Sequence, residues 1–331
     1  MLRLATLVYA FVFSVAAQEA VVTGITNPNT ITDDQWKIFQ ANVAKGADPP
    51  IPLKMLIRGQ LGSEEAMITA TRRGRVQLVA PSMNATTSVV PELGVFSLPY
   101  LFDTVPQMDE ILESVAKDEA RRLLADKGFE FLSWIDSGWV GLYGKDALTE
   151  PAAVAGYKLR TPTVVAAQEM ARVLAADAVY IPYPEIIPSL QTGLIRGGIT
   201  SDYPYATGGI SFEAPIFVYT RHTYDAGLFY ANKPWFDGLS ATNQALLRVA
   251  FGDPIDFRQR GRGYTTAAME QLKTKGVQVI ELTPDQRARW VEATRPVHRR
   301  VLDQLGPEAV KVYDAIQAAK QRFDHDVEKN K

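Results

Sequence analysis

The chain has 331 residues, of which 47% are hydrophobic and 22% are charged, the proportions of an ordinary globular protein. Its formal charge is −2 and it has no long basic segment, which argues against nucleic-acid binding, because phosphate recognition needs a concentrated basic face. It contains no cysteine, so disulfides, thiolate nucleophiles and cysteine zinc sites are excluded. The length suggests two domains.

Residues 1–17 have the features of a signal peptide. Arg3 supplies a positive charge, residues 4–15 are uncharged and mostly apolar, and Val15-Ala16-Ala17 offers small residues for cleavage. The apolar run is too short to span a membrane. We therefore expect the chain to be exported and the mature protein to begin near Gln18.

From residue 21 onwards, strand-like and helix-like segments alternate. The predicted strands cover 21–26, 53–57, 76–80, 129–134 and 277–282. Helices are predicted after Thr32 and Ser63, and over 107–126, 162–175, 186–193, 259–275, 283–304 and 307–323, with Pro296 as a candidate kink in the helix over 283–304. This alternation predicts an α/β protein built on a mostly parallel sheet.

Three segments, in this order, resemble a known family. They are Gly59–Met67 (GQLGSEEAM), Val90–Phe102 (VPELGVFSLPYLF), and Gly156–Gly193, which contains YKLRTP at 157–162 and LQTG at 190–193. Their spacing is similar to that in the substrate-binding proteins of tripartite ATP-independent periplasmic (TRAP) transporters, of the DctP type. The resemblance runs from about residue 21 to about residue 315.

The resemblance implies an α/β fold of the two-lobed periplasmic-binding-protein kind. Each lobe would be a mostly parallel sheet flanked by helices, with a long C-terminal helix bracing both lobes. The implied domains are the signal peptide 1–17, a first lobe of 18–137 plus 226–262, a second lobe of 138–225 plus 263–283, and a C-terminal helical segment 284–331.

The function that the resemblance implies is solute capture in the periplasm. A small organic acid would bind in the cleft between the lobes, and hinge closure would trap it. The loaded receptor would then deliver the acid to the membrane permease of a TRAP transporter. Neither catalysis nor a cofactor is implied.

Arg160 is the principal candidate for the ligand site. It follows Lys158-Leu159 in a strand-like run and precedes Thr161-Pro162, where a helix is predicted to start. A planar guanidinium at a strand end makes paired hydrogen bonds to a carboxylate, whereas lysine offers a point charge. The resemblance places Arg160 at the carboxylate-binding arginine of the family. The alternative is a surface or structural salt bridge.

Other candidate positions come from the resemblance and from the ends of the predicted strands, where ligands gather in open α/β sheets. Tyr183 matches a frequent ligand-facing aromatic residue, with a core role as the alternative. Thr200 matches a frequent asparagine, and Asn27 could instead be a turn residue. The full set of ligand-binding candidates is Arg160, Thr200, Tyr183, Asn27, Ser82, Asn84, Trp139, Ser201, Asp202 and Tyr203.

The chain departs from the family pattern at one charged position. Many members have a second arginine in a Gly-aromatic-Arg run, where this chain has Gly138-Trp139-Val140. Several aromatic residues lie near this run in the sequence or follow the Thr200 position: Trp134, Trp139, Tyr203 and Tyr205. The sequence therefore favours an aromatic or otherwise apolar monocarboxylate over a small polar keto or hydroxy acid. The alternative is that most of these rings belong to the core.

We expect no metal site. Some receptors of the family bind their acid through a metal ion, but Asp202 is the one candidate ligand, and one carboxylate is too few for a hard cation. Two other function classes stay open. An exported hydrolase would need an acid pair, such as Asp202 with Glu213 or Glu185, whose separation the sequence does not fix. An exported sensor would present its closed form to a signalling partner.

Overall fold

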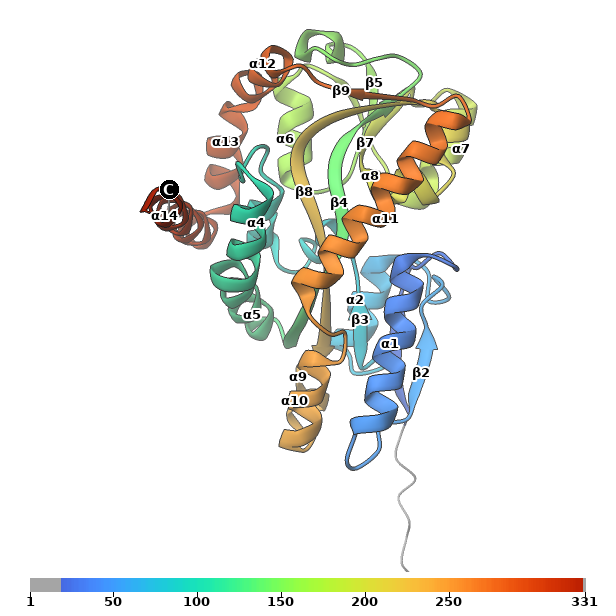
Figure 1. Cartoon of the computed structure of the whole chain (residues 1–331), viewed down its shortest axis with the longest axis vertical. Coiled ribbons are helices and arrows are strands. Elements are labelled where there is room, and N and C mark those ends of the chain that lie inside the picture. The colour runs from blue at the N-terminus through green and yellow to red at the C-terminus, as the bar shows by residue number, and fades with distance from the viewer. Residues whose placement is uncertain (1–18, 330–331) are drawn as a thin grey trace, which may run out of the picture.

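A computed structural model describes residues 19–329 of the chain (Figure 1). The predicted signal peptide and its cleavage site lie outside the described residues. Among residues 19–329, none of the helices combines the length and the apolar character needed to cross a membrane.

One continuous nine-stranded sheet runs through the described part of the molecule, in the order β2-β1-β3-β8-β4-β7-β5-β6, with β9 added to β8. Strands β1–β3 are parallel to one another and form the first lobe, and β5–β7 are likewise parallel and form the second lobe. The strands are β1 (Ala20–Gly24), β2 (Leu53–Leu56), β3 (Leu78–Ala80), β4 (Phe129–Gly144), β5 (Lys158–Thr161), β6 (Asp177–Tyr180), β7 (Gly197–Ser201), β8 (Ile216–Asn232) and β9 (Gln278–Glu281).

Two long antiparallel strands connect the lobes. The sixteen residues of β4 and the seventeen of β8 pair along almost their whole length. One end of β8 pairs with β3 in the first lobe, and the opposite end of β4 pairs with β7 in the second lobe. Their pairing shifts register around Ser137, at the crossing from one lobe to the other, which is where an extra residue bends a strand. The exact lobe boundaries stay a prediction.

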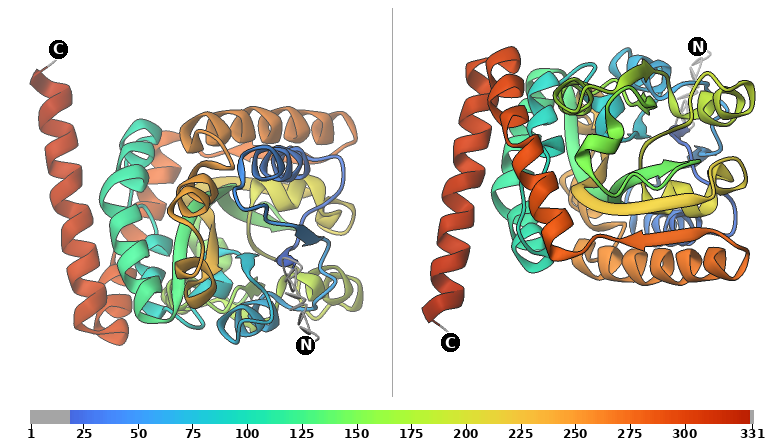
Figure 2. Two further views of the ribbon diagram at one scale, coloured as in Figure 1. Left: turned by 90° about the horizontal axis from the view of Figure 1, so that it is seen from below. Right: turned by 90° about the horizontal axis from the view of Figure 1, so that it is seen from above.

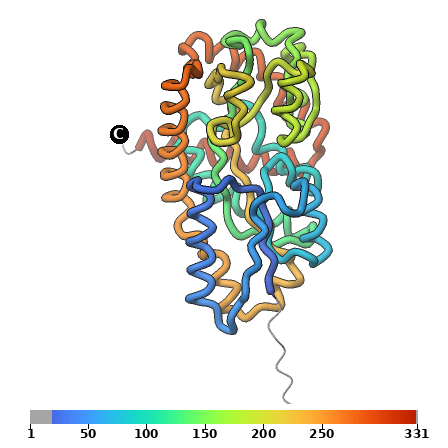
Figure 3. The backbone as a smooth tube through the Cα atoms, turned by 90° about the vertical axis from the view of Figure 1, so that its right-hand side faces the viewer, coloured from blue at the N-terminus to red at the C-terminus, as the bar shows by residue number. Residues whose placement is uncertain are grey.

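Helices cover both faces of the sheet (Figures 1 and 3). Helix α11 is the longest in this part of the chain and runs beside α1 of the first lobe and α8 of the second. The helices up to α11 are α1 (Ile31–Gly46), α2 (Glu64–Arg72), α3 (Met83–Thr86), α4 (Val105–Ile111), α5 (Lys117–Asp126), α6 (Val165–Val173), α7 (Ile186–Thr192), α8 (Asp202–Thr207), α9 (Lys233–Asp237), α10 (Ala241–Val249) and α11 (Pro254–Thr274).

Side-chain caps start several of these helices where the sequence predicts a start. The Thr30 hydroxyl accepts a hydrogen bond from the Asp33 backbone N–H (3.3 Å), and the Ser63 hydroxyl accepts one from that of Ala66 (3.3 Å). Each bond satisfies a backbone donor that has no partner within its helix. The boundaries α1 and α2 therefore agree with the predicted starts to within two residues.

Two predicted helices are divided. The helix predicted over 107–126 consists of α4, the π-helix η2 (Leu112–Ala116) and α5, and Ser114 has non-helical backbone angles (φ −112°, ψ −107°). The prediction of one helix was wrong because apolar residues continue across the break, so the sequence pattern carries no sign of it. The helix predicted over 283–304 is two helices, α12 (Pro284–Thr294) and α13 (Pro296–Leu305), separated before Pro296, which has no N–H to continue the first helix.

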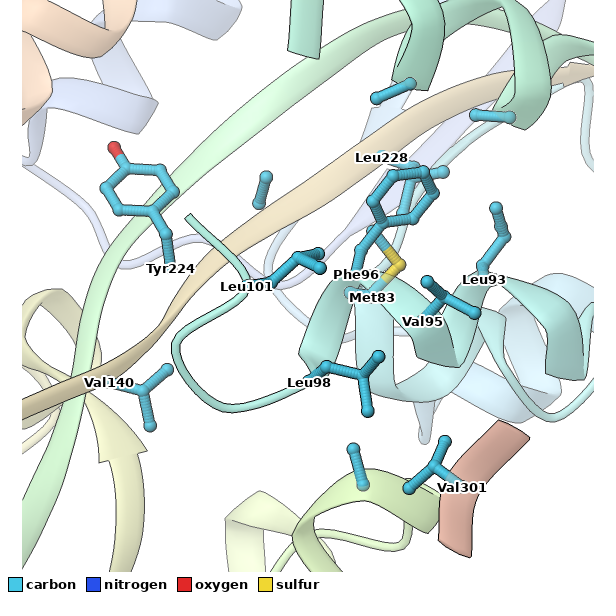
Figure 4. Close-up of a cluster of buried hydrophobic side chains, with 14 of the residues drawn as sticks. Met83, Leu93, Val95, Phe96, Leu98, Leu101, Val140, Tyr224, Leu228 and Val301 are labelled. Atoms are coloured by element: carbon cyan, nitrogen blue, oxygen red, sulfur yellow. The ribbon is translucent and has the colours of Figure 1, made fainter. Parts of the chain in front are cut away.

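A large apolar core joins the helices to the sheet. Figure 4 shows part of it, with side chains from the segment that follows β3 packed against β4, β8 and α13. Phe96 contacts Trp134 of β4 at 6.0 Å between ring centroids. The labelled members are Met83, Leu93, Val95, Phe96, Leu98, Leu101, Val140, Tyr224, Leu228 and Val301.

The C-terminal segment is helical, as predicted, and ends in the long helix α14 (Pro307–Lys329). Figure 2 shows α14 on the outside of the molecule, where it packs on α4, η2, α13 and the 3₁₀-helix η1 (Pro91–Ser97). Contact with both lobes is made by α13, which packs on α6 as well as on η1. His298 of α13 lies 2.7 Å from the carbonyl oxygen of Pro99, just beyond η1.

Candidate ligand-binding site

Arg160 is buried at the carboxyl end of β5, with 5% of its surface exposed. Its Nε donates to the carbonyl oxygen of Ile181 (3.0 Å) and its Nη1 to that of Ile199 (2.9 Å). Among residues 19–329, no carboxylate lies within ion-pair distance of its guanidinium, and no hydrogen bond is made by Nη2. Burial lowers the pKa of Arg160, because desolvation disfavours the charged form. The guanidinium is thus fixed in place and its charge is unpaired.

Thr200 lies beside Arg160. In the sheet, Arg160 is paired with Gly198 of β7, and Thr200 is two residues farther along that strand. Successive side chains alternate between the faces of a strand, so Thr200 and Arg160 emerge on the same face. Thr200 is 8% exposed. The structure therefore brings these two predicted residues together.

The three predicted residues after Thr200 form the start of α8. Ser201 and Asp202 are buried, and the Tyr219 hydroxyl donates to Asp202 Oδ2 (3.1 Å). Tyr203 is half-buried and its ring lies 6.2 Å from that of Tyr264. Burial raises the pKa of the Asp202 carboxyl to about 7, and the nearby Asp136 carboxylate adds to the rise. Asp202 is thus a buried carboxylate without an ion-pair partner among residues 19–329, and it lies at the edge of the second lobe that faces the first.

Tyr183 covers the same end of the second lobe. It is 36% exposed, and its hydroxyl donates to the carbonyl oxygen of Pro204 in α8 (3.1 Å). Burial raises the pKa of the Tyr183 hydroxyl to about 12, and the nearby charge of Arg160 opposes that rise. Tyr183 is not a core residue.

Asn27, Ser82 and Asn84 lie in the first lobe, just beyond the carboxyl ends of β1 and β3. Asn27 is exposed, and its side-chain amide donates to the Thr207 hydroxyl of α8 (3.5 Å), across the junction between the lobes. The Ser82 hydroxyl caps α3 through the backbone N–H of Ala85 (3.2 Å). Asn84 is half-buried in the first turn of α3. Of these three predicted residues, Asn27 contacts the second lobe, whereas the hydrogen bonds of Ser82 and Asn84 stay within the first lobe.

The aromatic residues divide between core and junction, which corrects the expectation of an aromatic-lined site. Trp134 is 3% exposed and donates through Nε1 to the carbonyl oxygen of Leu112, and Tyr205 is fully buried and donates to that of Ala214. Trp139 is half-buried, with its ring 5.1 Å from that of Tyr224. Two of the four rings that favoured an apolar ligand therefore belong to the core.

Val140 occupies the position of the second family arginine, and its side chain is directed into the apolar cluster of Figure 4. It is 8% exposed and pairs with Ser201 of β7. Arg160 is therefore not accompanied by a second arginine from this position.

Three carboxylates near the junction were missed from the sequence. Glu64 begins α2, and both of its oxygens accept hydrogen bonds from Ser82, from the backbone N–H and from the hydroxyl (2.7 Å each). Asp136 on β4 accepts a hydrogen bond from Tyr224, and Asp225 lies on β8 opposite Gly138. Asp225 is the one acidic residue of β8 (Ile216–Asn232) and is followed by the mostly apolar run Ala226–Ala231, and that contrast is the signal in the sequence.

Burial governs the ionisation of these carboxylates. It raises the pKa of Asp225 to about 7, helped by the nearby charges of Glu64 and Asp136. It also raises the pKa of Asp136 to about 7, and it raises that of Glu64. Among residues 19–329, no group of three or more histidine or acidic side chains has an arrangement that could hold a metal ion.

A surface groove of about 610 Å³ lies elsewhere, between α4, η2 and α11. Arg262 and Asp109 line it and form an ion pair (2.7 Å). None of the predicted ligand-binding residues lines this groove.

Comparison with known proteins agrees with this architecture. Residues 23–304 match the family model of the bacterial extracellular solute-binding proteins, family 7 (DctP). The chain is 26% identical over 268 residues to the ectoine-binding periplasmic protein TeaA of Halomonas elongata, which covers 78% of each chain. It is 25% identical over 287 residues to the C4-dicarboxylate-binding periplasmic protein DctP of Rhodobacter capsulatus, which covers 85% of each.

Solved structures show the same fold. A TRAP periplasmic solute-binding protein from Roseobacter denitrificans, with bound β-D-glucuronate, superposes with a TM-score of 0.85 at 22% identity and covers 91% of this chain and 99% of its own. Because the family match spans most of the chain, the protein is a solute-binding protein and not an enzyme. The chain belongs to the bacterial extracellular solute-binding proteins of family 7, the DctP family of TRAP transporter receptors.

Proposed function

We propose that this protein is a periplasmic receptor that binds a small organic acid between its two lobes and delivers it to a TRAP membrane permease. The observation that carries the proposal is Arg160, a buried arginine with no carboxylate partner among residues 19–329. Burying an unpaired charge is costly, and a ligand carboxylate would remove that cost.

The surroundings of Arg160 support a role in binding. Two backbone carbonyls hold Nε and Nη1, which leaves Nη2 to donate to a ligand without reorganisation of the side chain. Thr200 on the same face offers a hydroxyl, and Ser82 and Asn27 approach from the first lobe. In this proposal the ligand carboxylate binds Arg160, and the polar side chains of Thr200, Ser82 and Asn27 contact the rest of the ligand.

Trapping by closure is the second part of the proposal. The chain crosses between the lobes through β4, β8 and α11, and the contact between Asn27 and Thr207 joins the lobes away from those crossings. A ligand that contacts both lobes favours the closed arrangement by its differential affinity for that state. The periplasmic location and the permease partner are carried over from the relatives, whose names describe periplasmic binding proteins.

The experiment is ligand binding to Arg160 variants. Refolded, ligand-depleted protein is first screened by thermal shift with D-glucuronate, succinate and ectoine, the classes of compound named for the relatives. Affinity for the compound that binds is then measured by calorimetry. Loss of a charge-assisted hydrogen bond is worth about 1.5–3 kcal/mol, so Arg160→Lys and Arg160→Gln are expected to weaken binding about 10- to 150-fold.

The control is Arg196→Gln. Arg196 is in the same lobe, but it is exposed and pairs with Asp146 (2.6 Å). Its replacement should leave affinity unchanged, which separates loss of the site from a general effect of removing an arginine. Unchanged affinity in both Arg160 variants, with unchanged melting temperature, would contradict the proposal.

A further inference from the structure

The carboxylates at the junction between the lobes differ from the other buried carboxylates of the chain. Among residues 19–329, neither Glu64, Asp202 nor Asp225 has a lysine or arginine within ion-pair distance. Elsewhere the buried carboxylates do have such partners: Asp33 with Arg58, Asp109 with Arg258, and Glu130 with Arg248. Among residues 19–329, the lack of a lysine or arginine partner thus distinguishes the carboxylates at the junction between the lobes from these other buried carboxylates.

These three side chains converge on the hinge from three elements. Asp225 is on β8, opposite Gly138 of β4, and it is half-buried beside the Ser201 hydroxyl. Oδ1 of Asp202, from α8, lies directly against Gly138, so there is no room there for a Cβ atom. Glu64, from α2, is fixed by Ser82, and the residue before Ser82 accepts a hydrogen bond from the backbone of β8 (3.0 Å).

One oxygen in this group makes no hydrogen bond of normal length and angle in the described part of the chain, although the backbone N–H groups of Tyr203 and Trp139 lie near the carboxylate. Oδ1 of Asp202 is buried and makes no hydrogen bond with residues 19–329, although the residue is only 6% exposed. A buried acceptor without a donor costs free energy, so its presence points to a donor that is supplied from outside the chain. Arg160 has the complementary requirement, because its positive charge has no carboxylate partner among residues 19–329.

Arg160 cannot itself serve as that donor in the arrangement described. Its guanidinium is tied to the backbone next to β5, β6 and β7. In the sheet, β7 and β4 separate β5 from β8, which carries Asp225, and three strand spacings amount to about 14 Å. The strand that carries Arg160 and the strand that carries Asp225 are therefore not neighbours in the sheet, and among residues 19–329 no ion pair joins Arg160 to Asp225 or Asp202.

We propose that Asp225, with Glu64 and Asp202 beside it, selects ligands that carry a positive charge in addition to the carboxylate held by Arg160. The ligand class is a small zwitterion, with an ammonium or amidinium group some distance from its carboxylate. Asp225 is the specificity-determining residue because it is partly exposed, unlike Asp202, does not have both oxygens held by Ser82, unlike Glu64, and lies on the long strand β8 that connects the two lobes. The inference rests on the proposed function and narrows its substrate.

The test uses three acids of the same chain length that differ at one end: 5-aminopentanoate, pentanoate and glutarate. Their far ends are an ammonium, a methyl group and a carboxylate. Ectoine, a cyclic amidinium carboxylate, and D-glucuronate, an anion, complete the panel. We expect the ammonium-ended acid to bind at least about tenfold more tightly than pentanoate and glutarate to bind most weakly, because a carboxylate opposite Asp225 is repelled.

The matched variants are Asp225→Asn and Asp146→Asn. The first removes the charge and keeps the shape, so the preference for the ammonium-ended acid over pentanoate should fall by at least about tenfold. The second removes an exposed carboxylate of the second lobe that is paired with Arg196, and the preference should stay unchanged. A melting-temperature measurement on both variants checks that each one folds.

A second readout is the pH dependence of binding. The groups that face Asp225 are Glu64 from α2, Asp136 from β4 and Asp202 and Ser201 from the start of α8, while Arg262 of α11 is paired with Asp109. Binding of a cation needs the ionised carboxylate, and burial places the pKa of Asp225 at about 7. Affinity for the ammonium-ended acid should therefore rise from pH 6 to pH 8, affinity for D-glucuronate should not rise, and Asp225→Asn should flatten the rise.

Failure of this inference can be told apart from failure of the proposed function. If D-glucuronate or another anion binds in an Arg160-dependent way while neither zwitterion binds, the receptor role stands and the selection of a cation is overturned. If a zwitterion binds equally well to the wild type and to Asp225→Asn, the role of Asp225 is overturned. If binding of every acid is independent of Arg160, the proposed function fails as well.

Discussion

Asp136 on β4 accepts a hydrogen bond from the hydroxyl of Tyr224 on β8, at the place where the two long strands pass from one lobe to the other. Figure 4 shows Tyr224 on β8 close to the apolar cluster. The bond ties the connecting strands together through their side chains, in addition to the ladder between their backbones. It also gives the buried carboxylate of Asp136 a hydrogen-bond donor, since no lysine or arginine among residues 19–329 lies within ion-pair distance of Asp136.

Tyr224→Phe should destabilise the protein by about 1–3 kcal/mol at pH 8, because a buried carboxylate loses its donor. The loss should be smaller at pH 5, where the Asp136 carboxyl, whose pKa burial raises to about 7, is protonated in the folded state. Urea unfolding at the two pH values measures the difference. Tyr180→Phe, at an exposed position, is the control, and equal effects of the two variants would contradict the prediction.

Asp202 should make stability depend on pH in the neutral range. Its pKa is raised to about 7 in the folded state, against about 3.9 in an unfolded chain, so the folded state binds the proton more tightly between these values. The contribution of Asp202 to the free energy of unfolding should fall as pH rises from about 4 to about 7, by at most about 1.4 kcal/mol per pH unit, and stay constant above.

The measurement is the difference in free energy of unfolding between the wild type and Asp202→Asn, taken at several pH values from 4 to 8. Taking the difference removes the contributions of other titrating groups, such as the buried His222, whose pKa burial lowers to about 3. A difference that does not change with pH would show that Asp202 is ionised throughout.

Gly138→Ala should be more harmful than an ordinary substitution at a glycine with positive φ. Gly138 has φ of +90°, and Oδ1 of Asp202 occupies the space that a Cβ would need. Gly74 has φ of +73° and nothing within 4 Å, so Gly74→Ala isolates the backbone cost of about 1–2 kcal/mol. Gly138→Ala should cost at least about 1 kcal/mol more, because a buried carboxylate must shift. Equal melting temperatures would contradict the prediction.

The outer helix α14 should stabilise the protein through one face only. Ile316 is fully buried against the core, whereas Val327 in the same helix is 39% exposed. Ile316→Ala should therefore lower the free energy of unfolding by about 2–5 kcal/mol, and Val327→Ala should change it by less than about 0.5 kcal/mol. Denaturant titrations of the two variants provide the comparison, and similar effects would mean that α14 is not packed as described.

The main elements of the fold follow from local patterns in the sequence. Strands β1, β2 and β3 and the cap at Ser63 are short-range features, so the sequence is sufficient to place them, whereas the first helix was expected to start at Thr32 and is capped by Thr30. The break at Ser114 was not predictable because apolar residues on both sides continue the same pattern. The sequence also did not show that α13, and not α14, contacts both lobes. That depends on contacts of α13 with α6 and η1, which are far away in the chain.

The candidate site was predictable where a residue stands at the end of a strand in a recognisable segment. Arg160 and Thr200 are of this kind, and the structure places them side by side. Asp225 and Glu64 were missed because their proximity to the junction depends on how β8 crosses the sheet and on the Ser82 contact with α2. Trp134 and Tyr205 counted in favour of an apolar ligand but belong to the core, the alternative that the sequence left open, because an aromatic residue near a site in sequence can point into the core.

The strand order has a consequence for the order of folding. The free edge of β3 is covered by β8, where Ala231 pairs with Leu78, 153 positions earlier in the chain. All of β5, β6 and β7 lie between these partners in sequence, so the three parallel strands of the second lobe are present in the chain before the first lobe can close. A chain that ends before Asn232 leaves the first three strands with an open edge, and contacts of such long range slow folding. We therefore expect the three N-terminal strands to complete their part of the sheet only after β8 is available to pair with β3.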